Sequence, residues 1–280
     1  MIQAAVLGGD VSKSRSPAIH NAAYRALGIK GRYEALSVDA AGFGALVAEL
    51  GARGFAYLNV TIPHKAAAAA LATTRSAMVR HAAAANTLIF EPTSPTAIHA
   101  ANTDGYGLLA ALTDLGAEAG GQEIVLVGAG GAAAGALEAL TAAGARVRVV
   151  ARRADAAHAL VQQVPAARRS LARAFAWGDG GLAGALEGAR ALVSSVPAAA
   201  WAEPAAMASV EAIDRDTAVL EMAYGGSGPS ALGRAVRGRV ARYADGLGML
   251  VHQAARSIEL AVGESPPLAP LFTAARTARL

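Results

Sequence analysis

The amino-acid sequence predicts an α/β protein with a mostly parallel sheet. Short apolar runs alternate with alanine-rich stretches from one end of the chain to the other, as strands and helices do in repeated βαβ units. One apolar run, residues 124–127, ends in a glycine-rich turn that opens a helix. The last two predicted helices, residues 247–262 and 268–275, precede no further strand, so a C-terminal helical piece can pack back on an earlier part of the chain.

Each predicted strand is a short apolar run bounded by turn residues. In chain order the predicted strands are residues 3–7, 32–38, 57–61, 97–101, 124–127, 146–150, 191–194, 218–222 and 240–243. Alanine favours the helical state, so the Ala-rich stretches between these runs are predicted helices. They include residues 17–27, 107–115, 131–143 and 155–164.

Length and composition narrow the class of protein. A chain of 280 residues with 54% hydrophobic residues is expected to form one large or two modest domains. Changes in the pattern of strands and helices along the chain predict three segments, 1–102, 103–245 and 246–280. With no cysteine the chain has no disulfide, thiolate metal site or cysteine nucleophile, which favours a cytoplasmic location. The six histidines are scattered without metal-ligand spacing, so no metal is expected.

Charge and hydropathy argue against two kinds of partner. The N-terminus has no basic leader, and no apolar stretch approaches the roughly 20 residues of a membrane span. The net charge of +4 comes from dispersed arginines without interleaved aromatic residues, so nucleic-acid binding is not expected either. A small-molecule substrate is the expected partner.

The turn after residues 124–127 has the pattern of a dinucleotide-binding loop. Gly128 permits a tight turn, Gly130 lets the backbone approach a diphosphate, and Ala133 fills the small third position where the helix meets the strand. Ala129, Gly131 and Ala132 complete the loop, whose amides and helix dipole suit an anion. A purely structural glycine turn is the alternative.

The end of the next predicted strand indicates which nicotinamide cofactor the loop takes. Arg152 and Arg153 stand where an NAD enzyme usually has an acidic residue, and guanidinium groups can hold a 2′-phosphate. NADP is therefore the expected cofactor. The alternative is that both arginines are simply solvated at the end of the strand. Asp155 lies nearby, so NAD stays an alternative cofactor.

A lysine and an aspartate form the candidate proton-transfer pair. Lys65 follows predicted strand 57–61, and Asp104 follows predicted strand 97–101. If both strands share a sheet, the two side chains emerge at its carboxyl edge, where open α/β sheets bind ligands. A lysine can exchange a proton near neutral pH when desolvation lowers its pKa, whereas an arginine cannot. The alternative is that Asp104 caps a helix and Lys65 is solvated.

Six sequence blocks, taken together, resemble the shikimate dehydrogenase family, and they occur in the family's order along the chain. They are SRSPAIHN (14–21), NVTIPHK (59–65), ANT (85–87), NTDGYG (102–107), GAGGA (128–132) and DGLGMLVHQ (245–253). The resemblance implies an N-terminal α/β substrate domain, a Rossmann-type domain for NADP, and C-terminal helices returning to the first domain. The implied reaction is the reversible reduction of 3-dehydroshikimate to shikimate in aromatic amino-acid biosynthesis, by a monomer or homodimer.

The resemblance also implies roles for individual residues. Lys65 and Asp104 match the catalytic pair. The residues implied to bind substrate are Ser14, Ser16, Thr61, Asn86, Tyr224 and Gln253, while Met222 and Gly246 are implied to lie near the nicotinamide. Structural alternatives remain: the two serines can cap the helix that begins at Pro17, Asn86 can sit in a turn, Tyr224 can be a core-edge aromatic, and Gln253 can face solvent.

Three departures from the family pattern leave the substrate and cofactor open. The chain has Ala-Arg-Arg at 151–153, Ser-Ser-Val-Pro at 194–197 and Gly-Gly-Ser-Gly-Pro at 225–229, where the family commonly has Asn-Arg-Thr, Asn-Ala-Thr-Pro and a Thr-Pro segment. One alternative is a paralogue that acts on quinate or another shikimate-like polyol, with NAD as an alternative cofactor. An alternative of another class is a non-catalytic nucleotide-binding regulator.

Overall fold

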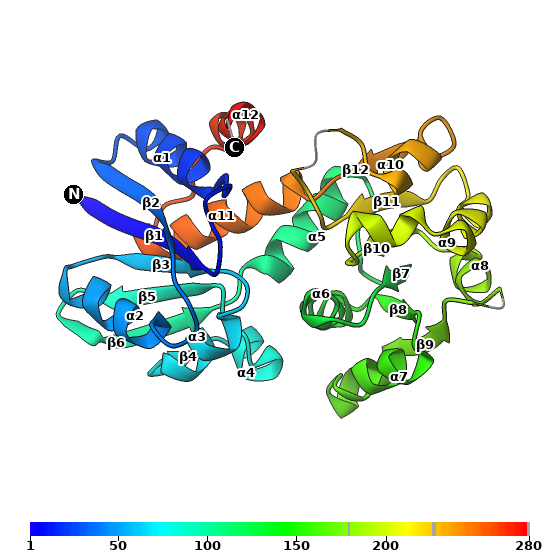
Figure 1. Ribbon diagram of the computed structural model, residues 1–280, viewed down its shortest axis with the longest axis horizontal. Helices are drawn as coiled ribbons and strands as arrows, with labels where there is room; N and C mark the ends of the chain where they lie inside the picture. The colour runs from blue at the N-terminus through cyan, green and yellow to red at the C-terminus, as the bar shows by residue number, and fades with distance from the viewer. Residues whose placement is uncertain (179, 226–227, 279–280) are drawn as a thin grey trace. The chain divides into compact units, whose positions relative to one another are not determined.

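The computed structural model describes residues 1–178, 180–225 and 228–278, which divide into two compact units (Figure 1). The first unit comprises Met1–Gly107 and Leu250–Leu280, and the second comprises Leu108–Met249. Residues 226 and 227, in the departing segment 225–229, lie outside the described residues.

The first unit is built on a mixed sheet of six described strands. Their order is β2 (Gly31–Ser37), β1 (Ile2–Gly8), β3 (Tyr57–Val60), β5 (Thr87–Glu91), β6 (Ser94–Ala101) and β4 (Thr74–Arg75). All pairings are parallel except those of β5, which runs antiparallel to β3 and β6. Neither β5 nor β4 is among the predicted strands. The apolar run of β5 is only three residues long, and β4 consists of two polar residues.

Helices cover both faces of this sheet. On one face α2 (Phe43–Ala52), α3 (Lys65–Leu71) and α4 (Ala77–Ala82) pack on Leu58 and Leu88. The opposite face meets α1 (Ser16–Ala26) and α11 (Leu247–Val262). The last helix, α12 (Leu268–Thr277), lies against α1 (Figure 1), where an Arg15 guanidinium nitrogen donates to the carbonyl of Ala275 at 3.0 Å. The predicted return of the C-terminal helix to the first domain is confirmed.

The second unit contains a sheet of six described strands that is parallel throughout. The order is β9 (Ala172–Ala176), β8 (Arg146–Ala151), β7 (Glu123–Val127), β10 (Ala191–Ser194), β11 (Ala218–Glu221) and β12 (Arg242–Ala244). Numbered within the unit this is the order 3-2-1-4-5-6 of doubly wound dinucleotide-binding domains. Strand β9 was not predicted, and β12 begins two residues after its predicted start.

The remaining helices of the described residues range from six to twelve residues in length. They are α5 (Asp104–Asp114), α6 (Gly131–Ala142), α7 (Ala154–Gln162), α8 (Gly181–Leu186), α9 (Pro204–Ser209) and α10 (Ala231–Val236), with 3₁₀ turns at Ala166–Leu171, Ala198–Ala202 and Val210–Ala212. Helices α1 and α9 each have a proline in the first turn. Proline is favoured there because the first N–H groups of a helix have no partner within the helix.

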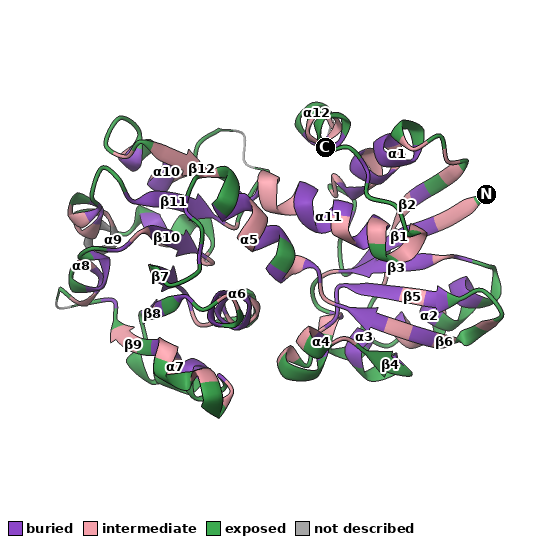
Figure 2. Cartoon of the chain, turned by 180° about the vertical axis from the view of Figure 1, so that it is seen from behind, coloured by how far each residue is buried: buried purple, intermediate pink, exposed green. Residues whose placement is uncertain are grey.

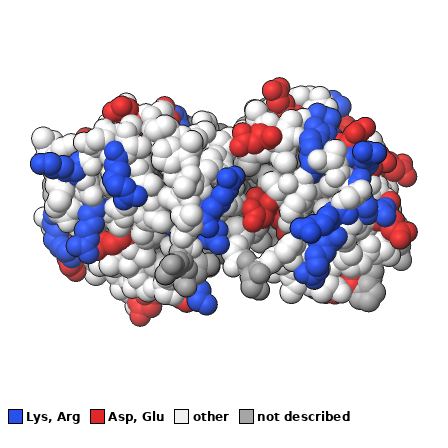
Figure 3. All heavy atoms as spheres, turned by 90° about the horizontal axis from the view of Figure 1, so that it is seen from above, with Lys and Arg blue, Asp and Glu red and all other residues white. Residues whose placement is uncertain are grey.

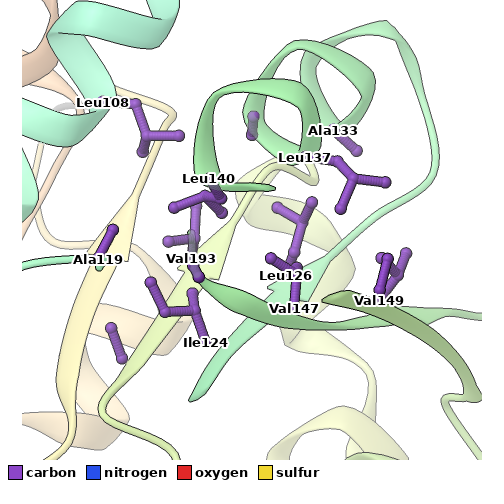
Figure 4. Packing of buried hydrophobic residues seen from close by; sticks show 14 of the residues in the cluster. Leu108, Ala119, Ile124, Leu126, Ala133, Leu137, Leu140, Val147, Val149 and Val193 are labelled. Carbon is purple, nitrogen blue, oxygen red and sulfur yellow. The ribbon is translucent and has the colours of Figure 1, made fainter. Parts of the chain in front are cut away.

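The second sheet buries mainly aliphatic side chains. In Figure 4, Leu137 and Leu140 of α6 face strand residues such as Leu126 and Val149. Figure 2 shows the central strands of both sheets as buried, consistent with strands that are covered on two faces. The near-continuous apolar runs that predicted these strands come from this two-sided burial.

Two surface properties bear on partners. No helix within the described ranges is both long and apolar enough to cross a membrane. On the face shown in Figure 3, Lys and Arg side chains lie in small groups among acidic and uncharged residues.

Candidate active site

The polar loops of the first unit gather at one edge of its sheet. Strands β3 and β6 are parallel to each other because each pairs antiparallel with β5 between them, so Lys65 and Asp104 follow strands that end at the same edge. The antiparallel strand begins where its neighbours end. Asn86, which directly precedes β5, therefore lies at this edge as well.

Lys65 and Asp104 form an ion pair. The ammonium Nζ of Lys65 donates to Oδ2 of Asp104 at 2.6 Å, and the side chains are only 32% and 26% exposed. The other oxygen, Oδ1, accepts from Nδ2 of Asn86 at 2.8 Å. At the start of α5, Asn102 Oδ1 accepts the Asp104 N–H at 3.1 Å. The helix start is thus supported by Asn102, and the Asp104 carboxylate is used for the pair, so the capping and solvated alternatives do not hold.

Asn86 is the centre of a buried amide cluster. Its Oδ1 accepts from the backbone N–H of Thr103 at 2.8 Å, and its Nδ2 lies 3.3 Å from Oε1 of Gln253. Gln253 is 9% exposed, and its Nε2 donates to the Leu250 carbonyl at 2.9 Å. Gln253 therefore faces the interior, and the solvent-facing alternative is wrong. The side chain of Asn86 likewise bonds to Asp104, Thr103 and Gln253, so its role is more than that of a turn residue.

A second layer of polar side chains lies beneath this cluster. Asn59 Nδ2 donates to Ser257 Oγ at 2.7 Å and approaches Thr87 Oγ1 at 3.1 Å, and Tyr33 donates to Asn59 Oδ1 at 2.7 Å. These residues received no role from the sequence. The available signal is Ser257, which stands one turn after Gln253 on an otherwise apolar helix face.

The first unit also buries a group of titratable aromatic residues. His20 Nδ1 and the hydroxyl of Tyr24 both lie 2.7 Å from the hydroxyl of Tyr57. Burial lowers the pKa of His20 from 6.5 to about 3 and raises the pKa of Tyr24 to about 12. Burial also raises the pKa values of Tyr33 and Tyr57 well above 10.0. All four groups are therefore neutral at physiological pH.

The serine motif forms the loop after β1. Ser14 Oγ accepts the backbone N–H of Ser16 at 3.2 Å, which leaves its own hydroxyl proton free to donate. The N-cap residue of α1 is Arg15, which makes no side-chain capping bond. Neither serine is the N-cap itself. Thr61 follows the adjacent strand β3, and the N–H of Gly9 donates to the Ile62 carbonyl at 3.0 Å, which joins the two loops.

The glycine turn of the second unit follows the first strand of the doubly wound order. Gly128 has φ +124°, and a Cβ there would lie 2.2 Å from Ser195 Oγ, so the position requires glycine. A Cβ on Gly130 or Gly131 would meet nothing within 4 Å, so open space lies beside the start of α6. Ala133 is fully buried against the sheet. Free helix-start amides beside open space fit a diphosphate.

The turn stands at the position where such sheets bind ligands. Strands β7 and β10 are neighbours at which the chain order reverses, and the segments at 128–132 and 194–197 leave their carboxyl ends. In open α/β sheets this reversal creates the crevice for a nucleotide. The residues present therefore fit a bound dinucleotide.

Arg152 and Arg153 lie at the carboxyl end of β8, and both are exposed. A guanidinium nitrogen of Arg152 donates to Oε1 of Glu203 at 3.3 Å, with the two side chains 70% and 55% exposed. Glu203 received no role from the sequence, because it lies 51 residues beyond Arg152. One candidate phosphate ligand thus has a carboxylate partner.

The two residues implied to lie near the nicotinamide, Met222 and Gly246, are in close contact. A Cβ on Gly246 would lie 2.1 Å from the carbonyl oxygen of Met222, and the N–H of Gly246 donates to Ala223 at 3.0 Å. Only glycine permits this approach. Tyr224 belongs to the same unit and is 41% exposed.

Comparison with known families identifies two matching regions. Residues 6–88 match the family described as the shikimate dehydrogenase substrate binding domain. Residues 116–214 match a family described as putative NAD(P)-binding. The first region falls within the first unit, and the second within the second unit.

Similar proteins match over nearly the full length. The shikimate dehydrogenase (NADP(+)) of Bordetella petrii is 38% identical over 99% of this chain and 96% of its own. The crystal structure of Mycobacterium tuberculosis shikimate dehydrogenase shares 33% identity with a TM-score of 0.85, covering 99% of this chain and 100% of that one. The Thermus thermophilus enzyme in complex with NADP(H) and shikimate shares 29% identity with a TM-score of 0.80, covering 99% of each chain.

Proposed function

The chain belongs to the shikimate dehydrogenase family, and on this basis we propose that it catalyses the NADP-dependent, reversible reduction of 3-dehydroshikimate to shikimate. The observation that carries the proposal is the ion pair of Lys65 and Asp104, in the unit that matches the substrate binding domain. The first unit, which includes the returning helices, is the proposed substrate domain, and the second unit is the proposed NADP domain.

Lys65 is the proposed proton donor and acceptor. NADPH, when bound, supplies a hydride to the substrate carbonyl carbon, and the oxygen then needs a proton. The ammonium of Lys65 gives this proton during reduction and its amine takes one during oxidation. Asp104 accepts a hydrogen bond from Lys65 through Oδ2 and from Asn86 through Oδ1, which keeps the lysine in a fixed position.

Hydroxyl and amide side chains are proposed to recognise the substrate. Shikimate carries a carboxylate and ring hydroxyls, and a site built on hydrogen bonds rejects analogues that lack them. The free hydroxyl proton of Ser14 can donate to the carboxylate, with Ser16 beside it. Thr61, Asn86 and Gln253 are proposed to bind ring hydroxyls. Tyr224 is proposed as a further substrate contact.

Glycines and arginines are proposed to hold the cofactor. The turn at Gly128–Ala132 and the first amides of α6 are positioned for the diphosphate. Arg152 and Arg153 are proposed to bind the 2′-phosphate, and Met222 and Gly246 to lie beside the nicotinamide. The lack of cysteine fits a cytoplasmic enzyme. We propose that it acts as a monomer or homodimer, which light scattering after size exclusion would test.

The direct test is an activity matrix of two substrates and two cofactors. The purified protein is expected to raise absorbance at 340 nm with shikimate and NADP+, with a higher kcat/KM than for quinate or for NAD+. A higher kcat/KM with quinate would identify a paralogue instead. No turnover in any of the four combinations, from protein that binds NADP+, would indicate a non-catalytic regulator.

Replacing the lysine isolates the proton step. Lys65→Ala should lower kcat by between about 100- and 10,000-fold, because it removes a positioned general acid–base group. NADP+ affinity should change little. It can be followed by tryptophan fluorescence, since Trp177 and Trp201 both lie in the second unit. The matched control is Lys30→Ala, which removes an exposed lysine of the same unit and should leave turnover intact. Full activity in Lys65→Ala would refute the assigned role.

A further inference from the structure

We infer that a one-way chain of buried hydrogen bonds positions the carboxylate of Asp104, and that its four members before Asn86 are positioning residues for the proton transfer proposed above. In order of donation the chain runs Tyr33, Asn59, Ser257, Thr87, Asn86 and Asp104. The hydrogen-bond chain itself is inferred from geometry, whereas its effect on proton transfer rests on the proposed function.

The orientation of the Asn86 amide is set by a backbone group. The N–H of Thr103 can only donate, and it lies 2.8 Å from Oδ1 of Asn86. The oxygen must therefore face Thr103, which turns the NH₂ group toward the carboxylate of Asp104 at 2.8 Å. An acceptor-only carboxylate is a matched partner for this NH₂ group.

The Asn86 oxygen then determines the direction of the next two links. Thr87 Oγ1 lies 2.9 Å from this oxygen and has a single proton, so Thr87 donates to Asn86. The 3.0 Å contact between Thr87 and Ser257 must consequently have Ser257 as the donor. Ser257 Oγ in turn accepts from Asn59 Nδ2 at 2.7 Å.

Asn59 is oriented in the same way, by a backbone carbonyl. The oxygen of the Asn86 main chain can only accept, and it lies 3.2 Å from Asn59 Nδ2. The Asn59 oxygen therefore faces the other way and accepts from the hydroxyl of Tyr33 at 2.7 Å. Burial raises the pKa of Tyr33 well above 10.0, so this hydroxyl keeps its proton.

The chain connects elements that are far apart in sequence. Asn59 and Thr87 are paired across β3 and β5, on the sheet face that meets α11, and Ser257 comes from that helix. Asn59, Thr87, Ser257 and Asn86 are all buried, and none of their polar atoms is among the unpartnered buried atoms of the described residues. A buried network in which each group has a partner holds its members in place, and this network orients the Asp104 carboxylate.

The test replaces the hydroxyl of Thr87 without changing its shape. Thr87→Val should lower kcat for shikimate oxidation about tenfold, the usual consequence of one lost buried hydrogen bond, with little change in either KM. Thr87→Ser keeps the donor and should recover kcat to within about threefold of wild type. The control Thr73→Val removes a hydroxyl that bonds both backbone groups of Ile98 in the same unit, and should leave kcat unchanged.

Ser257→Ala removes one of the two donors to Thr87 Oγ1, the other being Asn59 Nδ2 at 3.1 Å. It should also lower kcat, and the double variant with Thr87→Val should cost less than the product of the two single effects, because either change interrupts one network. Wild-type kcat in folded Thr87→Val, or an equal loss in Thr87→Ser, would overturn the inference. So would fully multiplicative effects in the double variant.

A readout without turnover separates this inference from the proposed function. The side-chain amide protons of Asn86 should exchange slowly with solvent in wild type and Thr87→Ser, and markedly faster in Thr87→Val, as measured by ¹⁵N NMR. If wild type shows this pattern but does not oxidise shikimate, the proposed function fails and the hydrogen-bond chain stands. If exchange is equally fast in all three proteins, the chain itself is refuted.

Discussion

The two units differ in how they use buried polar side chains. The first unit buries a connected set of polar groups on one face of its sheet and at the carboxyl edge, namely His20, Asn59, Asn86, Thr87, Thr103, Gln253 and Ser257. The second unit packs mainly aliphatic side chains on its sheet, and its functional turn relies on glycine backbone. Its buried polar residues are Glu138, Thr141, Ser194, Thr217 and Glu221. Proton transfer needs side-chain groups in fixed positions, whereas a diphosphate can be held by main-chain amides. The difference in burial therefore follows the difference in chemistry.

The units also differ in how acid affects their stability. His20 is neutral when buried and accepts a proton on unfolding, so its contribution is complete above pH 6.5 and decreases as the pH falls toward 3. Burial raises the pKa of Glu221 in the second unit, so its contribution is present at low pH and is lost as the pH rises through that pKa. Through these two groups, acid lowers the stability of the first unit and raises that of the second.

The largest expected effect on stability concerns two glycines of the second unit, one needed for the fold and the other for cofactor binding. Gly128→Ala should destabilise that unit by about 3 kcal/mol, because alanine at φ +124° is strained and its Cβ would collide with Ser195. Gly130→Ala should leave stability unchanged, since its Cβ meets open space, but should weaken NADP+ binding about tenfold or more by blocking the approach of the diphosphate.

Tryptophan fluorescence measures both outcomes, because both tryptophans lie in the second unit. Hydrogen exchange of β1 and β3 in the first unit should not change with Gly128→Ala. Equal stability of the two alanine variants, or unaltered NADP+ affinity in Gly130→Ala, would contradict the assignment.

The second expected effect concerns acid. Between about pH 6 and 4, His20 should contribute a slope of about 1.4 kcal/mol per pH unit to the stability of the first unit. His20→Phe retains an aromatic ring against Tyr33, leaves Tyr57 bonded to Tyr24, and should remove this slope. The measurement is native-state hydrogen exchange of β1 and β3, corrected for intrinsic rates. Glu221→Gln is the control, because it should alter only the fluorescence-detected unfolding of the second unit.

The smallest expected effect concerns cofactor choice. Glu203→Gln removes the carboxylate that pairs with Arg152, so NADP+ affinity should increase about two- to fivefold while NAD+ affinity stays the same. Raising the salt concentration should reduce the difference. Glu118→Gln, an exposed carboxylate of the same unit, controls for the change in net charge. An equal gain for NAD+ would show that the 2′-phosphate is not what Arg152 binds.

Local sequence patterns predicted most of the fold and the centre of the site. Parallel strands buried on two faces produce continuous apolar runs, so the strands that precede Lys65, Asp104 and Gly128 were found directly. Strand β5 was missed because only Leu88, Ile89 and Phe90 mark it, and with it the reason why Asn86 lies beside Asp104.

The sequence by itself determined that Lys65 and Asp104 follow strands able to share a sheet edge, and that a glycine turn opens the second unit. Only the tertiary structure decided that α11 would place Ser257 against Asn59 and Thr87, and that Glu203 would pair with Arg152. The physical reason is that helix and strand periodicity is written in neighbouring residues, whereas a hydrogen bond between groups 198 residues apart forms only when packing brings them together.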